Sequence, residues 1–134
     1  FSGIGFGSAD YCASTGGDMG KASLAYGRGK IINAAALYNT LALDGVWLDF
    51  RDPDGCREET LYVKTMGFKG RFAIHPDQIK PIHDAYRPTT EELKWAKGVL
   101  EEAKTAGSGA FKYQGKMVDA PVLAVARLII SRED

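Results

Sequence analysis

The sequence predicts an α/β fold in which helices connect the strands of a parallel sheet. Strand-like and helix-like stretches alternate three times before Pro88, and this alternation is typical of parallel strands joined by crossover helices. Polar residues gather where each strand gives way to its helix, at the edge where α/β proteins bind ligands. After Pro88 the alternation stops, so we expect two parts, residues 1–88 and residues 89–134.

The first two strand–helix units are read from the spacing of apolar residues. A strand is predicted at residues 3–7, where small and apolar residues alternate, and it is expected to end at Asp10. Apolar residues then recur at near-helical spacing over residues 21–41, which predicts a helix. A second apolar strand is predicted at residues 43–50, and it ends in an Asp-Pro-Asp-Gly turn. A helix over residues 56–66 follows, stopped by a glycine.

The third unit completes the predicted sheet. Its strand covers residues 71–74 and ends before Pro76, which cannot continue a central strand. Asp77 is expected to cap the next helix. The polar residues at the ends of the three strands are Asp10, Arg51 with Asp52, and His75.

The last part has a different pattern of elements. Residues 89–92 read Thr-Thr-Glu-Glu, a capping box, and Gly107 ends the helix that it opens. Residues 110–118 predict a small hairpin with Gln-Gly at its turn. Pro121 suits the first turn of a final helix.

Composition excludes several classes of protein. The formal net charge is zero, so no basic excess indicates nucleic acid or an anionic membrane surface. No apolar run approaches the ~20 residues that a membrane helix needs. Cys12 and Cys56 make neither a disulfide framework nor a metal knuckle, so we expect reduced thiols in a cytoplasmic protein. The chain enters directly into a strand at Phe1 with no Met, from which we expect a fragment.

Two aspartates are candidates for chemistry, and each has a structural alternative. Asp10 follows three small residues at a predicted strand end, where it could be an oxygen ligand to Mg²⁺ or could simply cap the next turn. Asp119 precedes Pro121 by two residues, a common way to start a helix.

The turn after the second strand carries a second group of candidates. Asp49, Arg51 and Asp52 could form a rim around an anionic substrate, or a salt-bridged turn. Asp44 lies earlier in the same strand, and a buried carboxylate there needs partners. His75 is either a base or a hydrogen-bonded structural residue.

Several strings, taken together and in order, resemble the citrate lyase β-subunit family within the HpcH/HpaI-type aldolases. The resemblance covers nearly the whole chain and is greatest to stand-alone CoA-ester lyases, which carry the same tail. The strings are GSADY at 7–11, LAYGRGKIINAA at 24–35, LDGVWLDFRDPDG at 43–55, MGFKGRFAIHPDQI at 66–79 and GAFKYQGKMVDAP at 109–121.

The resemblance implies a fold and a set of site residues. The fold would be the last three strand–helix units of a (β/α)₈ TIM barrel, followed by a C-terminal lid of helices and a hairpin. The earlier strands, which carry a glutamate metal ligand and CoA contacts, would be missing. Asp10 matches the ligand to Mg²⁺, and Asp119 matches a lid carboxylate that acts as acid and base. Arg51 joins the catalytic set, and substrate contacts would come from Asp44, Asp52 and His75.

The resemblance also implies an activity. A Mg²⁺-dependent carbon–carbon lyase would cleave a malyl-, methylmalyl-, citramalyl- or citryl-CoA type of 3-hydroxyacyl-CoA to an acyl-CoA and a 2-oxo acid. It would act only as the full-length protein, as a homotrimer or hexamer that exchanges lids, without nucleic acid or membrane partners. Two alternatives stay open: a metal-dependent aldolase on hydroxy-oxo acids without CoA, and an inactive half-barrel that serves as a binding module.

Overall fold

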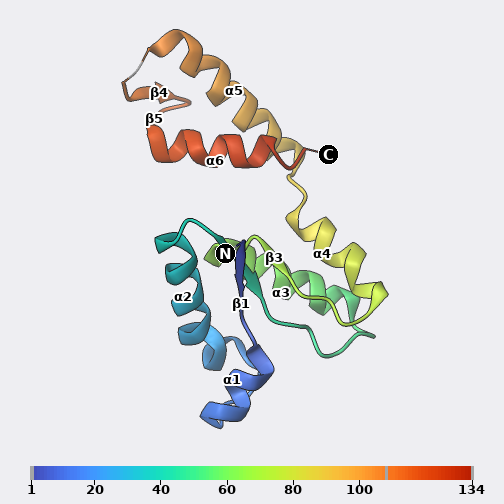
Figure 1. The fold of residues 1–134 in the computed structure, drawn as a ribbon. Coiled ribbons are helices and arrows are strands. Elements are labelled where there is room, and N and C mark those ends of the chain that lie inside the picture. The colour runs from blue at the N-terminus through green and yellow to red at the C-terminus, as the bar shows by residue number, and fades with distance from the viewer. Residues whose placement is uncertain (1, 108, 134) are drawn as a thin grey trace. The chain divides into compact units, whose positions relative to one another are not determined.

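The computed structural model describes residues 2–107 and 109–133, and the chain divides into two compact units. The first unit is Phe1–Tyr86 and the second is Arg87–Asp134. Figure 1 shows the chain as a ribbon, coloured from blue at the N-terminus to red at the C-terminus.

The first unit is built on a three-stranded parallel sheet with the order β1-β2-β3. β1 (Gly3–Gly5) pairs with β2 (Leu41–Asp44), which pairs in turn with β3 (Gly70–Arg71). Asp44 lies opposite Arg71 at the end of the ladder. The predicted α/β alternation is confirmed, and because the strands are parallel their carboxyl ends lie at the same edge of the sheet.

Helices connect these strands and follow the last of them. Gly16 (φ 74°) ends the first helix and Gly67 (φ 118°) ends the third, because glycine adopts the left-handed conformation without a Cβ penalty. The helices of this unit are α1 (Ser8–Thr15), α2 (Lys21–Leu37), α3 (Pro53–Met66), the short 3₁₀ helix η1 (Pro76–Gln78) and α4 (Ile79–Tyr86).

The helices cover one face of this sheet. Ala42 and Asp44 on β2 are 3% and 0% exposed, whereas Leu41 at the start of the same strand is 52% exposed. Side chains alternate between the faces of a strand, so Ala42 and Asp44 point toward the helices and Leu41 points away. The ring of Phe72 lies over Gly5 and is 44% exposed. Among the described residues of this unit, the face that carries Leu41 is therefore left open.

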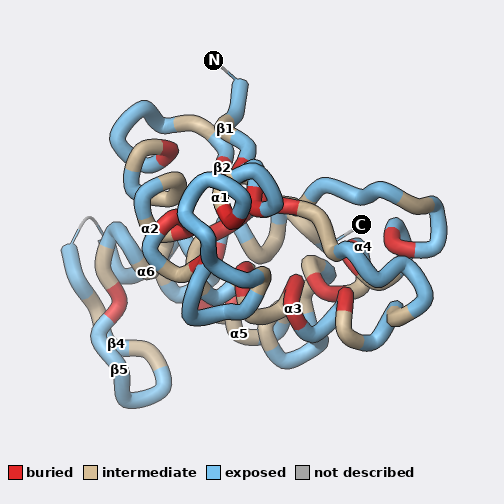
Figure 2. The backbone as a smooth tube through the Cα atoms, turned by 90° about the horizontal axis from the view of Figure 1, so that it is seen from below, coloured by how far each residue is buried: buried red, intermediate tan, exposed pale blue. Residues whose placement is uncertain are grey.

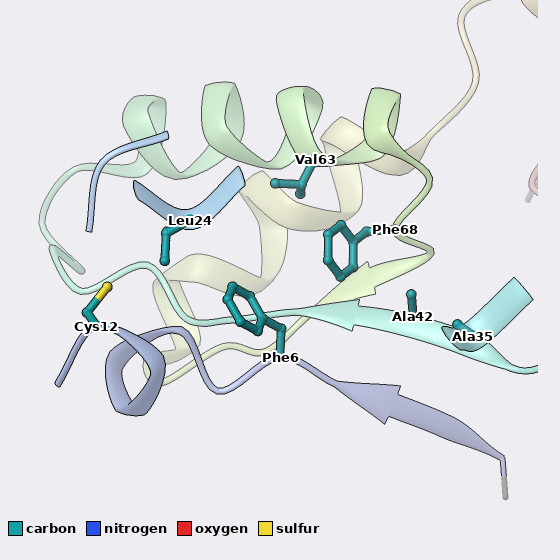
Figure 3. Packing of buried hydrophobic residues seen from close by; sticks show 7 residues of the cluster. All are labelled: Phe6, Cys12, Leu24, Ala35, Ala42, Val63 and Phe68. Carbon is teal, nitrogen blue, oxygen red and sulfur yellow. The ribbon is translucent and has the colours of Figure 1, made fainter. Parts of the chain in front are cut away.

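An apolar core fills the space between the covered face and the helices. It includes the side chains of Leu24 from α2 and Val63 from α3, at 1% and 0% exposure (Figure 3). The buried residues of this cluster are Phe6, Cys12, Leu24, Ala35, Ala42, Val63 and Phe68.

The strands are shorter than the sequence predicts. The strand expected at residues 43–50 ends at Asp44, because the Gly45 carbonyl accepts a hydrogen bond from the Arg71 side chain (2.9 Å) instead of continuing the ladder. The strand expected at residues 71–74 is likewise wrong beyond Arg71. The backbone N–H of Ile74 donates to the side chain of Gln78 at 2.9 Å, which takes it out of the sheet.

Two predictions about caps in this unit also need correction. Asp10 does not end a strand: β1 stops at Gly5, and Asp10 lies in the first turn of α1. Asp77 does not cap the next helix, because His75 is the residue before η1 and its ring accepts from the Asp77 backbone N–H. In both cases the turn lies earlier in the sequence than the apolar pattern indicates.

The second unit packs two helices against a hairpin. α5 (Thr90–Ala106) begins with the predicted capping box, in which Thr89 and Glu92 satisfy each other's backbone N–H groups. β4 (Phe111–Tyr113) and β5 (Lys116–Val118) form the predicted hairpin, and both turn residues, Gln114 and Gly115, have positive φ. The last helix, α6, covers Ala120–Ile130 and has Pro121 in its first turn, as predicted.

The core of this unit is small and separate from that of the first. Figure 2 colours the backbone by burial, and the buried side chains of this unit are Ala96, Val99, Val118 and Ala126. Within the described residues of the whole chain, none of the helices combines the length and apolar character needed to span a bilayer.

Candidate functional site at the carboxyl edge of the sheet

A buried network of charges lies at the end of β2. The Asp44 carboxylate accepts from Nε and Nη2 of Arg28, both at 3.0 Å, and from Nη2 of Arg71 at 2.8 Å. Arg28 also pairs with Glu59 at 2.8 Å. Asp44 is 0% exposed and the two arginine side chains are 1% exposed. Such charges persist in an interior only because each has close partners.

The network changes the acidity of its arginines. Burial acts to lower the pKa of Arg28, but the hydrogen bonds and charges of Asp44 and Glu59 outweigh it and raise that pKa. Burial dominates for Arg71 and lowers its pKa, although Asp44 acts in the opposite direction. Both oxygens of Asp44 are used by arginine, so in this structure Asp44 ties α2, β2 and β3 together and presents no free oxygen to a substrate.

A tight turn after β1 places Asp10 at the carboxyl edge of the sheet. Gly7 has φ −76° and ψ 75°, and Ser8 donates its N–H to the Phe6 carbonyl at 3.0 Å, which together make an inverse γ-turn. α1 starts at once, with Asp10 in its first turn and exposed. No group in the described part of the chain pairs with the Asp10 carboxylate, so its oxygens are free.

A free carboxylate of this kind suits part of a magnesium site. Mg²⁺ takes one or two carboxylates and fills its other positions with water and substrate oxygens. Across residues 2–107 and 109–133, no group of three or more His, Cys, Asp or Glu side chains converges as a metal site would require. Among the described residues, Asp10 therefore fits one ligand of such a site.

Arg51 and His75 both contact the ring of Phe50. Phe50 stacks on the imidazole of His75, with ring centroids 4.7 Å apart, and the Arg51 guanidinium lies 5.4 Å from the Phe50 centroid. His75 also accepts from the Asp77 backbone N–H at 3.2 Å. Asp49 turns back to accept from the Arg51 backbone N–H at 3.0 Å. The loop thus presents a cation and an imidazole, linked by a ring, at the carboxyl edge.

Phe50 is the residue of this group that sequence reasoning missed. We assigned it to a buried strand, whereas it is 40% exposed in a loop. Its place in the string Asp-Phe-Arg-Asp could have marked it, because a ring between charged residues in a turn is more often a contact surface than core.

Asp52 has a structural role in this loop. It is the N-cap of α3, and its Oδ1 accepts from the Gly55 backbone N–H at 2.9 Å. Pro53 in the first turn completes a standard helix start. The sequence left open whether Asp52 belongs to a substrate-binding rim or to a salt-bridged turn. In the structure Asp52 lies in a turn, where it caps a helix and does not form a salt bridge with any described residue.

Asp119 lies in the second unit and caps α6. Its Oδ1 accepts from the Val122 backbone N–H at 3.4 Å, a long bond. No described group bonds its other oxygen. The carboxylate is half-buried and follows β5 directly, so it has a defined place and one oxygen to spare.

A cavity of about 270 Å³ lies beside the charge network. It is lined by both arginines of the network together with apolar side chains such as Leu24 and Trp47. Asp49 of the loop after β2 is among its lining residues, whereas Asp10, Arg51 and His75 are not. The cavity therefore borders the loop that carries Arg51.

Comparison with known proteins gives a consistent picture. Residues 29–133 match the family described as a carbon–carbon bond lyase of the TIM-barrel fold. A mitochondrial citramalyl-CoA lyase from Rattus norvegicus is 37% identical over 131 residues, which are 94% of this chain and 39% of the relative. A citrate lyase subunit beta-like protein from Mycobacterium tuberculosis is 39% identical over 137 residues, 97% of this chain and 50% of the relative.

A solved structure extends the similarity to three dimensions. The crystal structure of CitE from Mycobacterium tuberculosis, in complex with magnesium, acetoacetate and coenzyme A, superposes with a TM-score of 0.80 at 36% identity. It covers 98% of this chain, which covers 52% of that protein. The chain thus spans about half the length of the relatives it matches, or less. It belongs to the family of carbon–carbon bond lyases of the TIM-barrel fold, among the citrate lyase β-subunit-like proteins.

Proposed function

We propose that the complete protein is a Mg²⁺-dependent lyase that cleaves a 3-hydroxyacyl-CoA to an acyl-CoA and a 2-oxo acid. The observation that carries this proposal is the free carboxylate of Asp10, held at the carboxyl edge of the sheet by the γ-turn at Gly7. Family membership supports it, as do relatives named citramalyl-CoA lyase and a related structure that holds magnesium and coenzyme A.

The reaction requires that negative charge be stabilised at the substrate's hydroxyl oxygen and that a proton be delivered to its α-carbon. The bond between the carbinol carbon and the α-carbon of the thioester breaks, the hydroxyl oxygen loses its proton, and the α-carbon gains one. Bound Mg²⁺ would hold the carboxylate and hydroxyl oxygens of the substrate and stabilise the negative charge that develops on them. Asp10 would supply one ligand to that ion. Asp119, with its spare oxygen, would move the proton at the α-carbon.

The basic side of the site is proposed to be the loop after β2. Arg51 would face the anionic carboxylate of the substrate, and His75 would hold a second contact across the Phe50 ring. Asp52 acts from its position as the α3 cap, by fixing the end of the loop. Asp44 would not contact the substrate; it would support the loop through its ion pairs with Arg28 and Arg71.

We propose that the first unit is the last three strand–helix units of a TIM barrel and that the second unit is a lid. The open sheet face with Leu41 and Phe72 supports the first part, because a barrel interior would cover such side chains. A lid would exclude water from the site when it closes. Exchange of lids within a homotrimer or hexamer is part of the same proposal.

The decisive experiment is a coupled assay of the full-length protein. Citramalyl-CoA is the first substrate to test, because the named relatives act on it, and malyl-CoA is the second. We expect release of pyruvate or glyoxylate with Mg²⁺ and none with excess EDTA. Turnover of free hydroxy-oxo acids alone would replace the proposal with a CoA-independent aldolase, and no turnover of either class would favour a binding module.

A further inference from the structure

Gly45, the residue that follows β2, lies directly beneath the turn that carries Asp10. It is buried, and a Cβ placed on it would overlap the Ser8 Oγ and would be 2.7 Å from the Ser8 Cβ and 3.0 Å from the Phe6 carbonyl oxygen. Its backbone conformation is open to any residue, so the only obstacle to a side chain is this contact. Gly29 in α2 is a useful contrast, since a Cβ there meets nothing within 4 Å.

The two sides of this contact differ in how firmly they are held. On the strand side, Arg71 donates to the Gly45 carbonyl at 2.9 Å and pairs with Asp44 at 2.8 Å. Asp44 is held in turn by two bonds from Arg28, and all three charged side chains are at most 1% exposed. Moving Gly45 away from the turn would therefore break buried ion pairs, which is costly.

The turn side is held less firmly. The described residues of the turn have no buried ion pair: Phe6 donates to the Leu43 carbonyl at 2.9 Å, and although Phe6 and Ser8 are buried, Gly7 and Asp10 on either side of Ser8 are exposed. When a side chain is forced between the two, the turn and the first residues of α1 have to move. Asp10 lies two residues beyond Ser8 on the same helical turn, so its carboxylate moves with them.

We propose that Gly45 is a positioning residue: the close contact of its Cα with Ser8 sets where the first turn of α1 lies and so where the Asp10 carboxylate is presented. This inference rests on the proposed function, because it takes Asp10 as the magnesium ligand. Residues that orient a ligand in this way typically change metal affinity by roughly 10–100-fold when they are altered.

The test compares variants of the full-length protein by calorimetric titration with MgCl₂, by thermal unfolding without metal, and by turnover. We expect Gly45→Ala to weaken Mg²⁺ binding by roughly 10–100-fold. The double variant Ser8→Gly with Gly45→Ala removes the obstructing atoms of Ser8 and should recover most of the affinity. Gly29→Ala should bind Mg²⁺ as the parent does. Val63→Ala, a core change in α3, should lower the unfolding temperature without changing metal affinity.

The outcomes separate the inference from the function on which it rests. If Asp10→Asn weakens Mg²⁺ binding and Gly45→Ala does not, the inference is wrong and the metal assignment stands. If Asp10→Asn binds as tightly as the parent, the metal assignment fails and the inference fails with it. Should Gly45→Ala not fold, Ser8→Thr adds a methyl group from the turn side, and unchanged Mg²⁺ binding in that variant also overturns the inference.

Discussion

Arg28 and Asp44 face each other across the covered side of the sheet in a two-point ion pair, with both hydrogen bonds at 3.0 Å and both side chains buried. The pair joins α2 to β2 and forms one half of the support under the loop that follows β2. Arg71 forms the other half, from β3.

Arg28→Met should lower the free energy of unfolding of the full-length protein by about 3–5 kcal/mol, because it leaves Glu59 without that partner and Asp44 with only one of its two arginines. Urea denaturation measures this. Lys80→Met is the control, since it removes a pair with Asp84 in which the lysine is 83% exposed, and it should cost less than about 1 kcal/mol. If the two substitutions lowered the free energy of unfolding equally, burial of the Arg28–Asp44 pair would make no difference to its contribution to stability.

Asp119→Asn should abolish turnover with little change in stability, because asparagine caps a helix as well as aspartate does. Asp119→Ala should lose turnover and also about 1 kcal/mol of stability, because the Val122 N–H then has no acceptor. Assays and thermal unfolding on the same preparations separate the two effects. An active Asn variant would leave Asp119 as a cap alone.

Arg51→Ala should reduce kcat/KM for the CoA ester by at least tenfold, because a charge-assisted contact to a carboxylate is worth about 1.5–3 kcal/mol. Stability should change little, since Arg51 is exposed and contacts Phe50 at the surface. Arg57→Ala, an exposed arginine within α3, is a matched control. Loss of activity in both variants to the same extent would remove Arg51 from the site.

Cys56 should resist alkylation in the folded protein. Burial raises the pKa of its thiol above the usual value of a cysteine, although the charge of the nearby Arg71 acts to lower it, so less thiolate is present than on an exposed cysteine. Mass spectrometry after iodoacetamide treatment, with and without urea, measures this difference. Rapid labelling of the folded protein at Cys56 would contradict it.

The same raised pKa sets the direction of a pH effect on stability. As the pH rises past the ordinary pKa of a thiol, the unfolded chain loses the thiol proton while the folded chain retains it. This ionisation lowers the free energy of the unfolded state, so the contribution of Cys56 to stability is complete below the unfolded pKa and is lost as the pH rises through the folded pKa. Cys56→Ala should flatten this part of the profile.

The sequence predicted the features that depend on neighbouring residues. The capping box at Thr89 and Glu92 and the hairpin turn at Gln114-Gly115 form as expected, because each is fixed by contacts within a few residues. The α/β alternation was also predictable, from the apolar pattern. Strand ends were not, because they depend on long-range bonds such as the one from Arg71 to the Gly45 carbonyl.

The partners of Asp44 were out of reach for the same reason. Arg28 is 16 residues away in the sequence and Arg71 is 27, so no local pattern connects them. Arg28 shares its helix with Lys21 and Lys30, so the sequence did not mark it as the buried arginine. The sequence predicted that Asp10 lies near the carboxyl end of the first strand. It did not predict that Asp10 lies in a helix, because the γ-turn before that helix has no sequence signal other than Gly7.

Within the described residues of the first unit, β1 and β3 each pair on one side only. A 134-residue polypeptide of this sequence prepared by itself would thus offer backbone donors and acceptors, next to bare leucine and phenylalanine, to any second molecule. We expect such a preparation to self-associate increasingly as its concentration rises.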